Sequence, residues 1–333
     1  MGKKNYWIGL ILSLIFLFFF LRKIDFGEVW EIFKELEYLY TLLPMGLYLF
    51  SMWIRAKRWA ILLKPIKKIQ TGELFKATTI GFMANNILPA RIGEVIRAVV
   101  IGHRVQISKT ASFATVVVER LFDGFTVFIL FVAVLFLVPF PPEQSSGFTL
   151  GAIKSIGLIS SAVYFAILAV LLLLRFENRQ VHRLINLLLN SLPERISAPV
   201  SRQINAFVSG LAVLQEGKEI LVVMAYSLFL WMTLSFCLYL LFIGFHFPLS
   251  FGSAVFVEVI LVFGVSIPSA PGFIGTFHWI CAAGLSFLGV EANQAKSYAM
   301  VLWLVGFIPI TGLGLFLLWR EGLSLNILKK TET

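Results

Sequence analysis

Residues 85–98, NNILPARIGEVIRA, interrupt an apolar stretch that extends from residue 77 to residue 101. Pro89 lacks the amide hydrogen that a continuous helix needs, and Gly93 adds backbone freedom. The two arms, 77–88 and 92–102, are each too short to cross a bilayer, which takes about 17–25 helical residues. This stretch therefore predicts a re-entrant helical hairpin with its break inside the membrane.

A second apolar stretch, 251–289, is broken in the same way by 271-PGFIG-275. This break contains Pro271, Gly272 and Gly275, and it shares the pattern P-x-x-I-G with residues 89–93. Its arms are longer than those of the first stretch. The sequence therefore leaves open either a second re-entrant hairpin or a pair of full spans.

Six further apolar stretches are expected to span a membrane. The composition agrees, because 59% of the 333 residues are hydrophobic and only 14% are charged, whereas about one-quarter is charged in an average soluble domain. The sequence thus predicts an all-α integral membrane protein with about six full transmembrane helices and two broken or re-entrant hairpins, in a single polytopic domain, 1–333. The predicted spans are 6–21, 39–54, 111–138, 152–174, 219–243 and 298–319.

The hydropathy pattern divides the chain into two similar halves, 1–145 and 146–333. Each half contains a span, an amphipathic segment, a span, a broken hairpin and a span. The first half would begin on one side of the membrane and the second on the other, which makes an inverted repeat. The alternative is that Pro and Gly only kink packed helices, which does not explain why the breaks fall at corresponding places.

The distribution of basic residues predicts the orientation. The net charge of +10 comes from 28 Lys and Arg against 18 Asp and Glu. Most of the basic residues fall on one side of the predicted spans, and such residues favour the cytoplasmic side. We therefore expect both termini in the cytoplasm, with the chain in the plasma membrane. The first span follows Lys3 and Lys4 and lacks a small-residue cleavage site, so an uncleaved anchor is expected rather than a signal peptide.

Charged residues at membrane depth are the candidate functional residues, because each costs roughly 2.5–3.5 kcal/mol on insertion scales. They could pair into a neutral network that locks the first hairpin to the third span. Alternatively, an Arg at the break is left partly free for an anionic headgroup, since its planar fork suits phosphate. The predicted lipid-binding residues are Arg91, Arg97, Asn85 and Asn86, and the predicted supporting network is Glu94, Glu119, Arg120 and Asp123.

Other polar residues have two interpretations each. Asn85 and Asn86 could hold headgroup oxygens or cap backbone groups. In the second half, Glu258 and His278 are expected to form a gate, with Glu258 as partner of a basic residue or as a proton-coupling site. The basic group Arg55, Lys57 and Arg58 is interpreted as an anchor at the inner headgroup level, or as a surface that gathers anionic lipid.

Several chemistries have no sequence signal. The chain has no G-x-x-x-x-G-K-[ST] and no H-x-x-x-H among its 4 His, so neither a P-loop ATPase nor a zinc protease is predicted. Its 2 Cys cannot staple a fold. We predict no catalytic residue, no metal, no cofactor and no nucleic-acid partner.

The motifs NNILPARIGEVIRA at 85–98 and VVVERLFDG at 116–124, with R-x-x-R-W at 55–59 and PGFIGTFH at 271–278, resemble the transmembrane flippase-like region of lysylphosphatidylglycerol synthases and their stand-alone relatives. The resemblance implies a protein associated with moving lipids between leaflets. The best-known members add a soluble C-terminal domain that transfers lysine from a charged tRNA to phosphatidylglycerol. This chain ends soon after Trp319, so a stand-alone member without that domain is expected.

One position departs from the family pattern. Relatives often carry a carboxylate after the second P-G-x-x-G turn, whereas this chain has Thr276, Phe277 and His278. A role that rests on that carboxylate would pass to His278 or Glu258.

The sequence and the resemblance together predict a membrane lipid translocase that moves an anionic or phosphate-bearing lipid between leaflets, and not an enzyme. Its expected partners are membrane lipids, either an anionic phospholipid or a polyprenyl-phosphate lipid. The alternative is a membrane-embedded enzyme or accessory subunit of polyprenyl-phosphate or glycolipid metabolism, with Asp25 or Glu28 among the acids of the enzyme.

Overall fold

The computed structural model describes residues 37–88, 91–138, 217–266 and 271–321, with scattered positions between 151 and 206. The predicted first span, most of the predicted fourth span and Pro89 lie outside the described residues.

Four long helices form the frame of the described structure. The predicted spans 39–54, 111–138, 219–243 and 298–319 are all confirmed as helices. At 1.5 Å per residue, even a helix of 25 residues is about 37 Å long, which exceeds the hydrocarbon thickness of about 30 Å. Among the described residues, α10 and α13 are the two helices both long enough and apolar enough to cross a membrane. The four helices are α3 (Leu39–Leu63), α6 (Lys109–Leu137), α10 (Gly217–Gly244) and α13 (Ala292–Arg320).

Helix α3 continues past the predicted end of its span and carries the R-x-x-R-W motif into the protein interior. Arg58 and Trp59 are 0% exposed and Arg55 is 5% exposed. Interpreting Arg55 and Arg58 as headgroup anchors is therefore wrong, because both guanidinium groups are buried against other helices. Lys57, on the same helix, is partly exposed and lies over the ring of Trp53.

The first broken stretch forms α4 (Thr71–Ile87) and α5 (Gly93–Val105). The two arms approach each other closely. A Cβ added at Gly93 would lie 1.9 Å from the carbonyl oxygen of Gly81 and 2.5 Å from Oδ1 of Asn85. Only glycine fits at position 93 without displacing the backbone of α4.

The second broken stretch forms α11 (Phe251–Val265), the short 3-10 turn η3 (Pro271–Phe273) and α12 (Thr276–Phe287). Ser250 starts α11, since its Oγ accepts a hydrogen bond of 3.2 Å from the amide of Ser253. With 15 and 12 residues, α11 and α12 are about 22 and 18 Å long. Both are shorter than the hydrocarbon core of about 30 Å is thick, and the choice between a re-entrant hairpin and two full spans stays a prediction.

The two breaks share an unusual backbone conformation. Arg91 and Phe273 are the third residues of the two P-x-x-I-G motifs, and they have φ angles of 53° and 57°. Residues other than glycine rarely adopt positive φ. In the second break, Gly272 and Gly275 also have positive φ, at 64° and 86°. The matching strain at matching positions supports related hairpins, while the inverted repeat as a whole stays a prediction.

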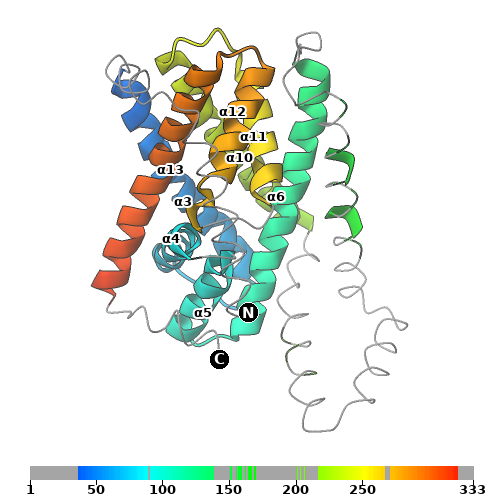
Figure 1. Cartoon of the computed structure of the whole chain (residues 1–333). Coiled ribbons are helices and arrows are strands. Elements are labelled where there is room, and N and C mark those ends of the chain that lie inside the picture. The colour runs from blue at the N-terminus through cyan, green and yellow to red at the C-terminus, as the bar shows by residue number, and fades with distance from the viewer. Residues whose placement is uncertain are drawn as a thin grey trace, which may run out of the picture.

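The two hairpins occupy opposite ends of the described bundle (Figure 1). Helices α4 and α5 lie in the lower half of that view and α11 and α12 in the upper half, with α6 along one side and α13 along the other. The breaks approach each other in between, where a Cβ on Gly272 would lie 3.1 Å from the carbonyl oxygen of Asn86.

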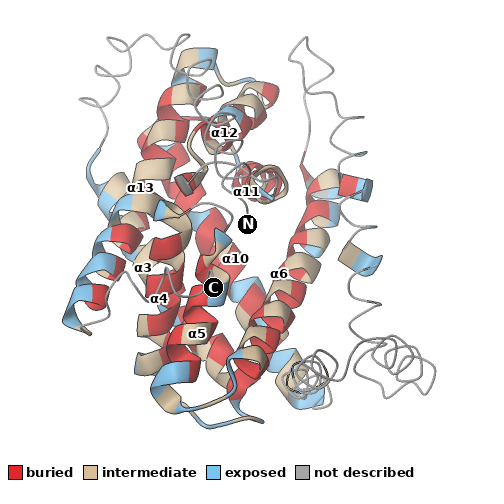
Figure 2. Ribbon diagram, turned by 60° about the horizontal axis from the view of Figure 1, so that its bottom comes forward, coloured by how far each residue is buried: buried red, intermediate tan, exposed pale blue. Residues whose placement is uncertain are grey.

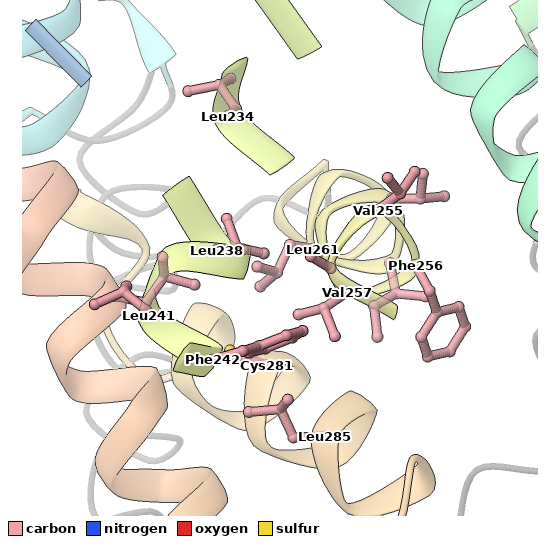
Figure 3. Packing of buried hydrophobic residues seen from close by; sticks show 14 of the residues in the cluster. Leu234, Leu238, Leu241, Phe242, Val255, Phe256, Val257, Leu261, Cys281 and Leu285 are labelled. Atoms are coloured by element: carbon pink, nitrogen blue, oxygen red, sulfur yellow. The ribbon is translucent and has the colours of Figure 1, made fainter. Parts of the chain in front are cut away.

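Two clusters of buried apolar side chains hold these elements together. One packs α10, α11, α12 and α13, where Leu238, Val257 and Cys281 face one another (Figure 3). Within it, the buried Tyr298 donates a hydrogen bond of 2.8 Å to the carbonyl oxygen of Leu238. The other packs α3, α4, α5 and the first half of α6. Much of α3, α5 and α10 is accordingly buried (Figure 2).

Candidate functional site

A buried ion pair between Arg58 on α3 and Asp123 on α6 lies at the centre of the charged residues. Arg58 donates from Nη1 to Oδ1 at 2.5 Å and from Nη2 to Oδ2 at 3.1 Å. Its Nη1 also donates to Oγ of Ser227 at 2.7 Å, and its Nη2 lies 3.0 Å from Oε1 of Glu119. Two parallel charge-assisted hydrogen bonds of this kind are among the stronger polar contacts in proteins.

Arg97 joins α5 to the same carboxylates. Its Nη1 lies 3.2 Å from both oxygens of Glu119, and its Nη2 donates to Oε2 of Glu94 at 2.7 Å. The guanidinium also lies 5.0 Å from the ring centroid of Trp59, whose Nε1 donates to Oγ1 of Thr115 at 2.9 Å. The sequence-predicted pairing of the first hairpin with the third span is thus present.

Arg120 completes the network at its outer edge. It donates to Glu119 at 2.8 Å and lies 3.3 Å from Asp123 and 3.6 Å from Glu94. Its side chain is 38% exposed, whereas those of Glu119 and Asp123 are 0% and 6% exposed. Arg120 is therefore the most exposed member of the network, followed by Glu94 at 20%.

Helical spacing explains how three helices meet at this point. Glu119 and Asp123 are four residues apart on α6, Arg55 and Arg58 are three apart on α3, and Glu94 and Arg97 are three apart on α5. Residues at these separations share one face of a helix. The seven side chains comprise four arginines and three carboxylates, so the network carries one excess positive charge.

Arg55 is the arginine of this network with the fewest partners. Its Nη1 lies 4.0 Å from Oδ2 of Asp123. Its Cζ lies 4.6 Å from the ring centroid of Phe82. Neither Nε nor Nη1 has a hydrogen-bond partner among the described residues, although both atoms are buried.

A cavity of about 160 Å³ lies beside Arg55, between the two hairpin breaks. Its wall combines residues from α3, α4, α10, η3, α12 and α13. Aromatic rings make up much of the wall, and Arg55 is its charged residue. The residues that line it include Tyr48, Ser51, Arg55, Phe82, Asn86, Gly272, Phe273, Phe277, Trp303, Gly306 and Phe307.

Arg91 contacts the second hairpin instead of the ion-pair network. Its Nη2 donates a hydrogen bond of 2.5 Å to the carbonyl oxygen of Val265, at the end of α11. Its Cζ lies 4.9 Å from the ring centroid of Phe273. Arg91 is exposed, and it joins the two breaks directly.

The two asparagines before the first break make contacts inside the protein. Oδ1 of Asn85 accepts a hydrogen bond of 2.8 Å from the amide of Gly93 and thereby satisfies the first amide of α5. Nδ2 of Asn86 donates to Oγ1 of Thr311 on α13 at 2.8 Å. Asn85 thus has the capping contact that the sequence suggested, while Asn86 lines the cavity.

The polar residues of the second half lie apart from the network. Nδ1 of His278 accepts a hydrogen bond of 3.2 Å from the amide of Gly275, so the imidazole caps the start of α12. Glu258 is 8% exposed on α11. It forms no ion pair with a basic side chain of the described segments. No group of three His, Cys, Asp or Glu that could hold a metal occurs among the described residues.

Sequence reasoning missed Arg55 and Arg58 as members of the buried network. The available signal was a charge imbalance, since the carboxylates predicted at membrane depth outnumbered the arginines there. It also missed Ser227 and Trp231 on α10. Oγ of Ser227 accepts a hydrogen bond from Arg58, and the indole of Trp231 donates one to Asp123. Single Ser and Trp residues in an apolar span carry no such signal.

Comparisons with known proteins agree with the motifs. The model of the lysylphosphatidylglycerol synthase TM region matches residues 6–314. A UPF0104 membrane protein of Methanothermobacter thermautotrophicus is 23% identical over 300 residues, which cover 86% of this chain and 87% of that protein. Glycosyltransferase AglD of Haloferax volcanii is 30% identical over 120 residues, which cover 36% of this chain and 19% of that protein. No solved structure matches.

The family match covers most of the chain, and the long apolar helices α10 and α13 are those of a membrane protein. The chain therefore belongs to the family of the lysylphosphatidylglycerol synthase transmembrane region.

Proposed function

We propose that this protein is a lipid translocase, which moves an anionic or phosphate-bearing lipid between the leaflets of the plasma membrane. The observation that carries this proposal is the cavity beside Arg55, which lies where the breaks of two short hairpins meet. Irregular backbone at membrane depth is tolerated where it is buried in protein or lines a cavity. Discontinuous helices around a central site are a recurring design of membrane transporters.

The proposed topology has both termini in the cytoplasm and the two hairpins entering the membrane from opposite sides, as halves of an inverted repeat. The lengths of α4, α5, α11 and α12 support re-entrance, since each helix is shorter than the hydrocarbon core is thick. The concentration of Lys and Arg at one end of the predicted spans supports the orientation.

The ion-pair network would provide a rigid support in this proposal. Arg58 and Arg97 connect α3, α5 and α6 through Glu119, and each also pairs with a further carboxylate, Asp123 or Glu94. The predicted contact of Arg97 with a lipid phosphate is not retained, since its side chain is 1% exposed and Arg97 does not line the cavity. We further propose that the protein performs no covalent chemistry, because the carboxylates of the network are engaged by arginines.

A second candidate function is accessory work in polyprenyl-phosphate or glycolipid metabolism. The partial similarity to a glycosyltransferase favours it, although that similarity covers only 19% of that relative. A translocated polyprenyl-phosphate lipid would also present a phosphate group, as a phosphomonoester where a phospholipid presents a phosphodiester. The two functions differ in whether a covalent product forms.

Reconstitution into vesicles tests the proposal. Lipids that carry a fluorophore on the headgroup are placed in both leaflets, and a reductant that cannot cross the membrane bleaches those outside. With the protein present, we expect the bleached fraction to rise above one-half for phosphatidylglycerol or a polyprenyl phosphate. Equal bleaching in protein-containing and empty vesicles for every phosphate lipid would contradict the proposal, and a new product by mass spectrometry would favour the second candidate.

A further inference from the structure

We propose that the cavity between the two breaks is a binding site for the phosphodiester group of a lipid headgroup, and that Arg55 is the residue that holds it. This inference deepens the proposed function, on which it rests for the identity of the ligand as a lipid. It assigns the central contact to Arg55, which sequence reasoning had placed at the headgroup level.

The first support is the state of the Arg55 side chain. Only 5% of Arg55 is exposed, and its Nε and Nη1 atoms have no hydrogen-bond partner in the described part of the chain. A buried charged group without hydrogen bonds is costly, and proteins retain such a group where a ligand satisfies it. Arg55 is also one of the residues that line the cavity, and it is the charged residue of that wall.

The second support is that the neighbouring carboxylate is already engaged. Asp123 accepts two hydrogen bonds from Arg58 and one of 3.2 Å from the indole of Trp231, and it lies 3.3 Å from Arg120. Arg55 approaches it only to 4.0 Å. The lone pairs of Asp123 are therefore used by other donors, and Arg55 remains without a full counter-ion.

The charge of the network selects the class of anion. With four arginines and three carboxylates, one positive charge is left. A bound phosphodiester has one negative charge and would bring the net charge of the network to zero. A dianionic phosphomonoester would leave one excess negative charge. Among the described residues, the ion pair of Arg55 is the one to Asp123 at 4.0 Å, and none joins Arg55 to Glu258 on α11.

The rest of the wall suits the parts of a lipid next to the phosphate. Two other polar residues of the wall bond to protein: Trp303 donates to the carbonyl of Gly272 at 2.7 Å, and Ser51 donates to that of Tyr48 at 2.6 Å. Phe82 and Phe307 offer apolar surface beside them. A molecule with one anionic group and apolar flanks matches this arrangement better than a free inorganic ion.

Binding to the full-length protein in a nonionic detergent tests the site without transport. The probe is dihexanoyl phosphatidylglycerol, a soluble lipid with a single phosphodiester charge, and the readout is the rise of Tm with probe concentration. We expect a larger rise than with dihexanoyl phosphatidylcholine, whose headgroup is neutral overall. Inorganic phosphate and dimethyl phosphate test the free ions, and a rise with either equal to that with the lipid would overturn the lipid assignment.

Variants of Arg55 test whether this residue holds the phosphate group. Arg55→Gln should weaken binding of the probe by at least about 10-fold, the factor for losing charge-assisted hydrogen bonds, and Arg55→Lys should weaken it less. Lys57→Gln is the matched control, because it removes a partly exposed charge from the same helix. Unchanged binding in a folded Arg55→Gln protein would overturn the inference.

A second variant covers the case in which Arg55→Gln fails to fold. A Cβ at Gly306 meets Tyr48 at an ordinary 3.4 Å, so Gly306→Leu extends a side chain into the cavity without removing charge. Gly312→Leu on the same helix is its control, because nothing lies within 4 Å of a Cβ there. Gly306→Leu should lose binding and Gly312→Leu should keep it, and equal binding by both would overturn the site.

The outcomes separate this inference from the proposed function. Transport in vesicles without probe binding to the Arg55 cavity would refute the site and leave the translocase intact. Probe binding without transport of any phosphate lipid would refute the translocase and leave an anion site.

Discussion

Arg58 on α3 and Asp123 on α6 form two parallel hydrogen bonds, of 2.5 and 3.1 Å, across 65 residues of chain. Their side chains are 0% and 6% exposed. The pair fixes the relative position of two long helices, and the arginine that lines the cavity lies one turn away on the same face of α3.

Replacement of Arg58 should destabilise the protein strongly. In Arg58→Met, the carboxylates of Asp123 and Glu119 would lose a buried partner, and breaking a buried pair on one side costs about 3–5 kcal/mol. Unfolding in a detergent solution by denaturant measures the loss. Lys57→Met is the control, and we expect a change within about 1 kcal/mol, since Lys57 only lies over Trp53. Equal losses in both variants would mean that the buried pair contributes nothing specific.

A methyl group at Gly93 should disturb the first hairpin. In Gly93→Ala, the new Cβ would lie 1.9 Å from the carbonyl oxygen of Gly81, and overpacking of this kind costs about 1–3 kcal/mol. Gly72→Ala on α4 is the control, because nothing lies within 4 Å of a Cβ there and alanine favours helix by up to about 1 kcal/mol. Thermal unfolding compares the two, and a Gly93→Ala protein as stable as the wild type would contradict the close contact of α4 and α5.

The end of α13 should contribute stability that depends on pH. Hydrogen bonds from Arg104 and Lys76 lower the pKa of Glu321 below its ordinary value of 4.5. A lowered pKa in the folded state means that this stability is complete above pH 4.5 and is lost as the pH falls through the lower folded value. Since such exposed pairs contribute about 1 kcal/mol or less, Glu321→Gln should lower stability slightly at pH 7 and not at the acid end. A constant difference between the two proteins at all pH values would refute the linkage.

Arg91 should affect lipid movement more than stability. Its side chain is exposed and makes one hydrogen bond, to the carbonyl of Val265, and one such bond contributes about 0.5–1.5 kcal/mol. We expect Arg91→Ala to fold with a nearly unchanged Tm and to move headgroup-labelled lipid more slowly in vesicles, because the two breaks lose their direct contact. If Arg91→Ala instead unfolds more readily and the folded fraction transports normally, the contact is structural only.

Hydropathy and Pro-Gly punctuation were enough to predict most of the described helices. The spans at 111–138 and 219–243 became α6 and α10 with ends shifted by only a few residues. The arms of the first hairpin also became separate helices. Such features are local, since the length of an apolar run and a Pro or Gly within it are visible in the sequence itself.

The end of α3 could not be predicted by the same means. Hydropathy ends the span at residue 54, where Arg55 begins a run of basic residues, yet the helix continues to Leu63. The acids that neutralise Arg58 lie 61 and 65 residues further along the chain, on α6. In the sequence, a basic residue at the end of an apolar run is interpreted as lying at the headgroup level. The acids that pair with it in the folded protein are tertiary contacts, which the local sequence does not show.

Only part of the candidate site could be predicted, because the rest of it also depends on tertiary contacts. The pairing of Arg97 with Glu119 followed from charges at membrane depth. The position of Arg91 against Val265 depends on how two hairpins meet, and the cavity depends on Gly272 approaching Asn86. Neither contact produces a recognisable pattern within a single segment of the sequence.

Transport of headgroup-labelled phosphatidylglycerol in vesicles tests the central claim most directly, when the wild type is compared with Gly306→Leu and Gly312→Leu. If phosphate lipids pass through the cavity between the breaks, the wild type and Gly312→Leu will expose inner-leaflet lipid to the reductant faster than empty vesicles do, and Gly306→Leu will match the empty vesicles. A wild type no faster than empty vesicles, or a folded Gly306→Leu as fast as the wild type, would contradict the claim.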